Sequence, residues 1–154
     1  MAKKLTIEDA PALVIDTREP PDTRYQCEHP TVVTKLDTGD YSIVGLEGCV
    51  AVERKELGDF IGCVGNSRDR FSRELARSNG MRRLWVVIEA TLSDIAVGNY
   101  RSQINTSAVL GSIAAWENRF DSARFVFAGS RSLGQHFTFR LLTRAWLDDI
   151  QGVL

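Results

Sequence analysis

Two short apolar runs, joined by a Gly-Leu-Glu-Gly turn, carry charged residues at regular positions within residues 39–59. The first run begins with Asp40, and the second, residues 49–55, contains Glu53 and Lys55. Because strand side chains alternate between faces, Glu53 and Lys55 share one face of the second run. The turn allows the two runs to pair as an antiparallel hairpin. The sequence therefore predicts a hairpin that brings Asp40 near the Lys55 end of its partner strand.

Two carboxylates and a lysine placed in this way are the groups that a metal-dependent phosphodiesterase requires. Carboxylate oxygens bind hard divalent cations such as Mg²⁺, and the cation activates water and stabilises charge on a phosphate. A neighbouring lysine can orient that water or offset the charge of the transition state. Asp16 follows another apolar run and can add a third carboxylate. The alternative is a solvent-exposed strand edge with one ordinary Glu–Lys pair, and the combination of these segments favours the catalytic interpretation.

Three segments of the chain together resemble the XPF-type structure-specific endonuclease domain. They are Ile15-Asp16-Thr17-Arg18-Glu19, Gly39-Asp40-Tyr41 and Val52-Glu53-Arg54-Lys55, the last followed after three residues by Asp59. The signature of that family is a Gly-Asp pair, then Glu-Arg-Lys, three further residues and Asp, and the chain matches it at every position. The resemblance covers nearly the whole chain from Leu13 onward. A signature in several separate parts is far more specific than a single short motif.

The resemblance implies an α/β domain with a restriction-endonuclease-like core of the PD-(D/E)xK type, in which helices flank a mixed central sheet. It also implies Mg²⁺- or Mn²⁺-dependent cleavage of DNA near branches or junctions, in repair, recombination or phage DNA processing. By the same resemblance, Asp40 and Glu53 are metal ligands and Lys55 is catalytic. Asp16 is expected to be a further catalytic residue in or beside the metal site.

Other charged residues are expected to support the site. Arg54 points away from Lys55 in a strand, so we assign it support or DNA contact. Asp59 is expected to start or brace the following helix, and Arg18 and Glu19 belong to the matched segment around Asp16. Glu89 follows a dense apolar run, where it lies either near the metal site or at the rim, paired with an arginine.

The chain departs from larger members of the family, which carry a helicase-like region or tandem helix-hairpin-helix domains. Its 154 residues have room for neither. The link between Asp16 and Asp40 is short and contains several prolines, so a helix usual in the family is expected to be shortened or absent there. The chain resembles the stand-alone nuclease domains of bacteria and phages, with an N-terminal lead over residues 1–12 and a single nuclease domain over residues 13–154.

The composition favours a globular domain in a reducing compartment. A hydrophobic content of 44% can form a substantial core. The sequence contains no apolar run of about 18 residues that could span a membrane, and its first residues lack the apolar run of a signal peptide. Three cysteines without metal-site spacing are expected to be reduced thiols. We therefore expect a cytoplasmic protein, in a bacterial cell or a phage-infected host.

The net charge of −1 means that any DNA-binding surface must be local. Residues 68–78 are predicted to form a helix in which Arg70, Arg73 and Arg77 share one face, opposite its apolar residues. Arginine readily forms bidentate contacts with phosphate. Arg68, at the start of this helix, is assigned the same DNA-binding role. The alternative is an ordinary solvated face, and the neighbouring nuclease signature favours phosphate contact.

The chain alternates between strand and helix patterns, which is typical of a layered α/β domain. Strands are predicted over residues 13–18, 32–36, 40–44, 49–55, 84–90 and 124–128. Helices are predicted over residues 57–64, 68–78, 91–97, 107–120 and 133–150.

The two C-terminal helices also raise the question of assembly. Their large apolar residues are Trp116, Phe120, Phe137, Leu141 and Trp146. The resemblance suggests that these helices pair two copies of the chain as a homodimer. The alternative is that all of this apolar area covers the sheet of its own domain.

Two alternatives to a DNA endonuclease stay open at this point. One is a catalytically lapsed DNA-binding or dimerisation module of the same fold. Such a copy would be expected to lose Asp40, Glu53 or Lys55, and this chain retains all three. The other is a nuclease that prefers RNA or linear DNA ends.

Overall fold

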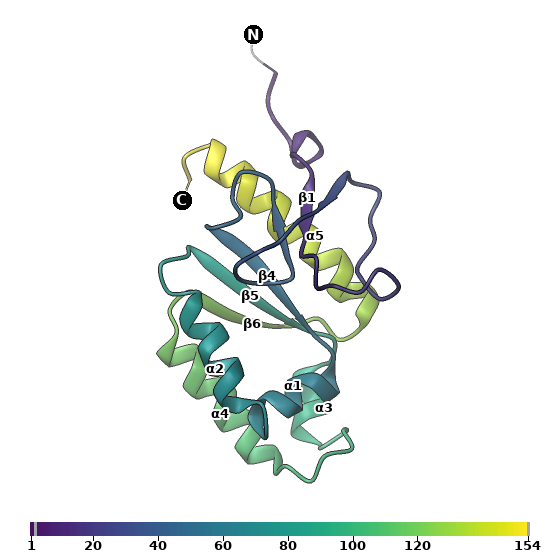
Figure 1. Cartoon of the computed structure of the whole chain (residues 1–154), viewed down its shortest axis with the longest axis vertical. Coiled ribbons are helices and arrows are strands. Elements are labelled where there is room, and N and C mark those ends of the chain that lie inside the picture. Colours follow the sequence, from purple (N-terminus) through teal and green to yellow (C-terminus); the bar gives the residue numbers. More distant parts are fainter. Residues whose placement is uncertain (2, 154) are drawn as a thin grey trace.

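One six-stranded mixed sheet lies at the centre of the molecule (Figure 1), in the strand order β2-β1-β3-β4-β5-β6. The structure is a computed structural model that describes Met1 and residues 3–153. β3 pairs antiparallel with both β1 and β4, whereas the β1–β2, β4–β5 and β5–β6 pairs are parallel. The strands are β1 (Leu13–Ile15), β2 (Thr31–Val33), β3 (Tyr41–Ile43), β4 (Val50–Lys55), β5 (Arg83–Ile88) and β6 (Ala123–Phe127).

Helices cover both faces of this sheet and bury a separate hydrophobic cluster on each. Four helices lie together on one face, where Phe60, Phe71 and Trp116 are buried, and α5 packs across β3 and β4 on the other face (Figure 1). The helices are α1 (Leu57–Val64), α2 (Arg68–Arg77), α3 (Leu92–Ala96), α4 (Thr106–Arg119) and α5 (Arg131–Ile150), and a short 3₁₀ turn, η1 (Ile7–Asp9), precedes β1. Within the described residues, none of them has the length and apolar character that crossing a bilayer requires.

The β3–β4 hairpin has the predicted antiparallel form. Gly39 precedes it with φ of +84°, and a Cβ at this position would lie 2.8 Å from the Cβ of Ala51, so both backbone conformation and space require glycine. The N–H of Asp40 donates a 2.8 Å hydrogen bond to the carbonyl of Val52. Tyr41 is the register partner of Val52. The hairpin therefore places Asp40 beside the second half of β4, as expected.

The loop after β1 explains why two strands are shorter than the sequence predicts. β1 ends at Ile15 because the Asp16 carboxylate accepts from the N–H of Arg18 and so closes a turn. β2 ends at Val33, and the N–H of Leu36 then donates to Asp16 instead of continuing the sheet. Between the two strands the described chain forms turns without a helix, as the prolines predict. The other elements agree with the predicted ranges to within one or two residues.

Candidate functional site

The predicted metal ligands Asp40 and Glu53 line one small cleft between the hairpin and α2. Asp40 directly precedes β3, and Glu53 lies in the antiparallel partner strand β4. The cleft has a volume of about 140 Å³. Its walls are Arg18, Asp37, Thr38, Gly39, Asp40, Glu53, Phe71, Glu74, Leu75, Arg77 and Leu84. Two carboxylates from the two arms of the hairpin thus line one small cleft, as the hairpin geometry predicted.

Backbone hydrogen bonds hold the Asp40 carboxylate in place. The N–H of Arg54 donates to Asp40 Oδ2 at 2.8 Å, across the hairpin. The carbonyl of Asp40 accepts from the N–H of Asp16 at 2.8 Å, so β1 also holds this residue. The side chain is therefore oriented by the sheet itself and not by a flexible loop.

Lys55 lies beside Glu53 on the same face of β4. Its ammonium is 3.2 Å from Glu53 Oε1, and the two side chains are only 15% and 14% exposed. The same ammonium lies 5.5 Å from the centre of the Phe71 ring. Burial opposes the charge of Lys55, but nearby acidic groups, Glu53 first among them, raise its pKa. Lys55 is therefore positively charged and fixed next to the cleft.

Burial and mutual repulsion make the two cleft carboxylates costly in their charged forms. Burial, followed by the charge of Glu53, raises the pKa of Asp40 well above its ordinary value. Burial also raises the pKa of Glu53, against the opposing effect of Lys55. Such a pair is stabilised when a cation lies between its members. Excess negative charge in this cleft thus favours a bound cation.

The donor set fits a hard divalent metal ion. Both ligand candidates provide carboxylate oxygens, which Mg²⁺ and Mn²⁺ prefer. Within the described part of the chain, no group of three or more His, Cys, Asp or Glu side chains forms a ready cluster for a metal. A magnesium ion is often held by only one or two carboxylates and keeps several water ligands. Asp40 and Glu53 therefore meet the requirement without a third direct ligand.

Asp16 occupies a different position from the one expected of a metal ligand. It is fully buried, and both of its oxygens accept hydrogen bonds within the protein. Oδ1 accepts from the N–H of Leu36 at 2.7 Å. Oδ2 accepts from the backbone N–H of Arg18 at 3.0 Å and from its Nε at 2.7 Å. Burial opposes the charge of Asp16, but these bonds outweigh it and lower the pKa. In this arrangement Asp16 holds Arg18, which lines the cleft, and lies beside Asp40, to whose carbonyl its N–H donates.

Arg18 itself lines the cleft. Its Nη2 donates to the carbonyl of Leu36 at 2.9 Å, which fixes the guanidinium at the rim. The hydrogen bond to Asp16, with smaller effects from the charges of Asp40 and Glu53, raises the pKa of Arg18. The sequence assigned Arg18 only general support, whereas its position allows it to contact a phosphate.

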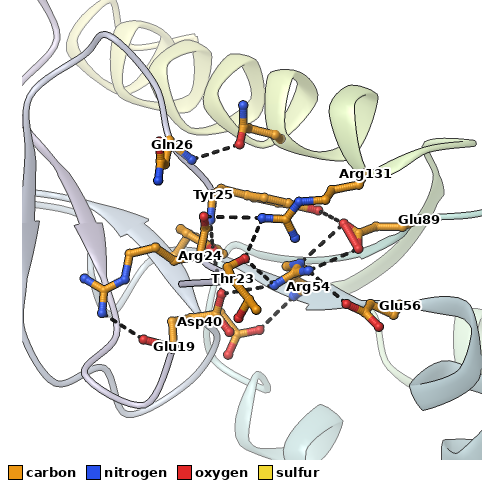
Figure 2. A network of polar contacts seen from close by, with 12 residues as sticks. Glu19, Thr23, Arg24, Tyr25, Gln26, Asp40, Arg54, Glu56, Glu89 and Arg131 are labelled. Carbon is orange, nitrogen blue, oxygen red and sulfur yellow. Dashed lines mark hydrogen bonds and ion pairs between the residues drawn. The ribbon is translucent and has the colours of Figure 1, made fainter. Parts of the chain in front are cut away.

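Arg54 lies in an internal network of polar contacts on the other face of β4 (Figure 2). Its side chain is 7% exposed, and its Nε and Nη2 each lie 3.3 Å from an oxygen of Glu89. Nη1 donates to the carbonyl of Thr23 at 3.0 Å, and Nη2 donates to Glu56 at 3.2 Å. Nη1 also lies 3.7 Å from Glu19. The guanidinium is engaged within the protein, which favours the support role and leaves Arg54 out of the DNA-contacting set.

The same network fastens the proline-containing loop to the sheet through Tyr25 and Tyr41, whose contacts no sequence pattern indicated. The rings of Tyr25 and Tyr41 stack with centroids 5.2 Å apart. The Tyr25 hydroxyl donates to Glu89 at 2.8 Å, and the Tyr41 hydroxyl donates to Glu19. Arg131 of α5 lies 5.5 Å from the Tyr25 ring and donates to the carbonyl of Thr23 (Figure 2). Two positions were expected for Glu89, one near the metal site and one paired with an arginine. Its pairing with Arg54 corresponds to the second.

The predicted arginine face of α2 is exposed beside the cleft. Arg70, Arg73 and Arg77 are exposed, whereas the apolar residues of the opposite face are buried. Arg77 also lines the cleft. Arg68 behaves differently, because its Nη1 donates to Ser112 at 2.7 Å and its guanidinium lies 5.1 Å from the Trp116 ring. Arg68 packs against α4 and is not in a position equivalent to the other three.

Two further acidic residues, Asp59 of α1 and Glu74 of α2, lie in this region. Asp59 is exposed in the first turn of α1, where a negative charge stabilises the helix N-terminus, in line with the expected bracing role. Glu74 of α2 lines the cleft with Asp40 and Glu53, a position that its sequence context did not indicate. Glu74 is not part of the signature. Its place next to the buried Leu75 on α2 was the sequence signal that could have indicated a position near the sheet.

Comparisons with known proteins agree with this fold. The model of the ERCC4 domain family matches residues 15–141 of the chain. Among solved structures, XPF from Aeropyrum pernix is similar with a TM-score of 0.67 and 17% sequence identity. The match covers 88% of this chain and 61% of that chain. No curated protein shows a significant sequence match to the chain.

These similarities confirm the predicted fold class. The six-stranded mixed sheet with flanking helices corresponds to the restriction-endonuclease-like fold of the XPF nuclease domain. The family match extends over most of the chain and includes every part of the Gly-Asp and Glu-Arg-Lys signature. The chain belongs to the ERCC4 domain family of XPF-type nucleases.

Proposed function

We propose that the protein is a Mg²⁺- or Mn²⁺-dependent DNA endonuclease that hydrolyses phosphodiester bonds near branches or junctions. The observation that carries this proposal is the meeting of Asp40 and Glu53 in one cleft, with Lys55 held beside them. A catalytically lapsed module would not need to keep all three side chains in this arrangement. The family match supports the nuclease assignment, and the substrate structure is part of the proposal.

In this proposal each residue of the cleft has a separate task in hydrolysis. Asp40 and Glu53 would hold a divalent cation, which would supply polarisation of the phosphate and activation of a water molecule. Lys55 donates a hydrogen bond to the attacking water or to a phosphate oxygen, which offsets the developing negative charge. The water oxygen bonds to phosphorus as the P–O ester bond breaks; the water gives up one proton to solvent and the departing oxygen gains one, so the products are a phosphomonoester and an alcohol. Arg18 and Arg77, at the cleft rim, hold the phosphate in position.

The DNA would approach along the arginine face of α2. Arg70, Arg73 and Arg77 are exposed on that helix, and Arg77 also lines the cleft. A protein with a net charge of −1 needs such a local basic surface to bind a polyanion. Arg54 and Arg68 are not included, because their guanidinium groups are engaged within the domain.

The cellular setting is proposed on the same grounds. We assign residues 13–154 to one nuclease domain preceded by a lead of 12 residues, acting in DNA repair, recombination or phage DNA processing. Cys27, Cys49 and Cys63 are free thiols. Free thiols are typical of a reducing compartment, so we place the protein in the cytoplasm of a bacterial cell or a phage-infected host.

A homodimer through the C-terminal helices is proposed on a smaller surface than the sequence suggested. Trp116 and Phe120 are buried in the domain's own core, at 0% and 7% exposure. Leu133 and Phe137 of α5 remain 56% and 42% exposed. Two-fold pairing is the commonest way to cover such a patch. Light scattering of the wild type and of Phe137→Glu should give a dimeric and a monomeric mass, and a monomeric wild type at micromolar concentration would contradict the proposal.

A panel of labelled DNA substrates tests the substrate class. We expect faster cleavage of flap, fork and junction DNA than of plain duplex in the presence of Mg²⁺, and none in EDTA. Asp40→Asn protein, prepared in parallel, is the control for contaminating nucleases. Equal cleavage of all DNA forms would remove the structure-specific part of the proposal, and faster cleavage of matched RNA would replace DNA as the substrate.

A further inference from the structure

Glu74 places a third carboxylate on the wall of the proposed active-site cleft. It lies on α2, one position before the fully buried Leu75, whereas Asp40 and Glu53 come from the facing hairpin. The hairpin and α2 therefore each contribute acidic groups to the same small space. Nothing in the Gly-Asp and Glu-Arg-Lys signature accounts for Glu74.

One oxygen of Glu74 is shielded from solvent without a hydrogen-bond partner. Oε2 is buried, and no donor within the described residues bonds to it. A buried carboxylate oxygen without a donor is costly, and nearly all such groups in proteins have a partner. Glu74 therefore calls for a donor that the rest of the described chain does not supply.

The surroundings of Glu74 increase this cost. Glu74 lines the same cleft of about 140 Å³ as Asp40 and Glu53, so three carboxylates share one small space. The nearby ammonium of Lys55 pairs with Glu53 at 3.2 Å, and Glu74 forms no ion pair among the described residues. Concentrating like charges in a buried space is unfavourable unless a cation compensates them.

Geometry argues against Glu74 as a third direct metal ligand. No three acidic, His or Cys side chains in the described ranges form a ready metal cluster. A magnesium ion held by one or two carboxylates keeps several water ligands, and these waters donate hydrogen bonds. Carboxylates around a metal site commonly accept such bonds and orient the ligands.

We infer that Glu74 is a positioning residue of this site, and that it accepts a hydrogen bond from a water ligand of the cation held by Asp40 and Glu53. The inference rests on the proposed metal-dependent activity and extends it to α2. It explains both the donorless oxygen and the accumulation of negative charge in the cleft. Glu74 lies on α2 between the buried side of the helix, which carries Leu75, and the side that carries the exposed arginines.

Metal binding in the absence of DNA tests this inference without relying on activity. Mn²⁺ affinity is measured by electron paramagnetic resonance for the wild type, Glu74→Gln, Asp69→Asn and Asp40→Asn. Asp69 is an exposed carboxylate of the same helix, so Asp69→Asn is a control for the loss of one negative charge. We expect Glu74→Gln to weaken Mn²⁺ binding by about tenfold, as for other residues that orient metal ligands. Asp69→Asn should bind as the wild type does, and Asp40→Asn should lose binding.

Melting temperatures of the metal-free proteins separate this role from a structural one. Glu74→Gln relieves repulsion in the cleft, so its melting temperature without metal should equal or exceed that of the wild type, with a smaller increase on addition of Mn²⁺. Wild-type Mn²⁺ affinity in Glu74→Gln, together with loss of binding in Asp40→Asn, would overturn the inference and leave the proposed function intact. Unchanged binding in Asp40→Asn would overturn the metal site itself and the inference with it.

Discussion

The backbone N–H of Arg54 holds Asp40 Oδ2 at 2.8 Å, while the Arg54 side chain pairs with Glu89 at 3.3 Å on the other face of the sheet. One residue of β4 thus links the cleft to the network that fastens the loop after β1 (Figure 2). This arrangement gives the central residue of Glu-Arg-Lys a physical role, since its side chain fixes the strand from which Glu53 and Lys55 project.

Removal of the Arg54 side chain should therefore destabilise the whole domain. Arg54 and Glu89 are 7% and 6% exposed, and Arg54→Ala leaves the Glu89 carboxylate buried without its cation. Breaking a buried pair in this way costs about 3–5 kcal/mol. Urea unfolding measures the loss. Glu56→Gln is the matched control: Glu56 is 62% exposed and pairs with the same guanidinium, so its loss should cost less than about 1 kcal/mol.

In the metal-free protein, the contribution of Asp40 to stability should fall as the pH rises, because the pKa of this carboxyl is raised in the folded state. A raised pKa means that the folded protein holds the Asp40 proton more tightly than the unfolded chain does. The resulting stabilisation is complete below the unfolded value of about 4 and is lost as the pH rises through the folded value.

Asp40→Asn removes this proton and keeps an oxygen that can accept from the N–H of Arg54. In EDTA, its melting temperature should exceed that of the wild type near neutral pH, and the difference should shrink as the pH falls toward 4.5. Melting temperatures that change with pH in the same way for both proteins would show that the charged form of Asp40 is not destabilised in the folded state.

The arginine face of α2 should determine the salt dependence of DNA binding. Replacing Arg70, Arg73 and Arg77 with Gln removes up to three phosphate contacts, each of which contributes roughly 0.9 to the slope of log affinity against log salt. Fluorescence anisotropy with an Asp40→Asn background measures binding without cleavage. Arg101→Gln combined with Arg119→Gln serves as the control for exposed arginines elsewhere. An unchanged slope in the α2 variant would restore the interpretation of a plain solvated face.

Lys55 should be needed for turnover and not for metal binding. Lys55→Met keeps much of the side-chain volume and its contact with Phe71, but it removes the ammonium that offsets phosphate charge. We expect cleavage to fall by about 10²-fold or more, with Mn²⁺ affinity at pH 8 close to that of the wild type. If Lys55→Met loses Mn²⁺ binding while remaining folded, the lysine acts through Glu53 and our assignment of its role is wrong.

Much of the fold follows from local patterns in the sequence. The hairpin was predictable because a Gly-Leu-Glu-Gly turn joins two short apolar runs, which can then pair as antiparallel strands. The helix α1 has the predicted bounds, Leu57–Val64. Strand ends were less predictable: β1 stops at Ile15 because the Asp16 carboxylate closes a turn, and no apolar pattern records that bond.

In the candidate site, too, some residues were predictable from local sequence, whereas others depend on contacts with distant parts of the chain. Asp40, Glu53 and Lys55 were identifiable because the signature contains them, and because strand alternation and the turn predict that they come together. The environment of Asp16 depends on Leu36, which is 20 residues away, and the place of Arg68 depends on Ser112, which is 44 residues away. Helical periodicity gives the face of a residue and not the element against which it packs. Glu74 was missed for this reason, since only the folded chain brings α2 against the hairpin.

Cleavage of a labelled fork by wild type, Asp40→Asn and Glu53→Gln in Mg²⁺ tests the central claim most directly. The wild type should cleave, and both variants should lose cleavage while keeping the circular dichroism spectrum and much of the DNA affinity of the wild type. Each variant replaces a carboxylate with an amide of the same shape, so the loss would report the charge and not the packing. Cleavage by either folded variant at near the wild-type rate would contradict the assignment of this cleft as the active site.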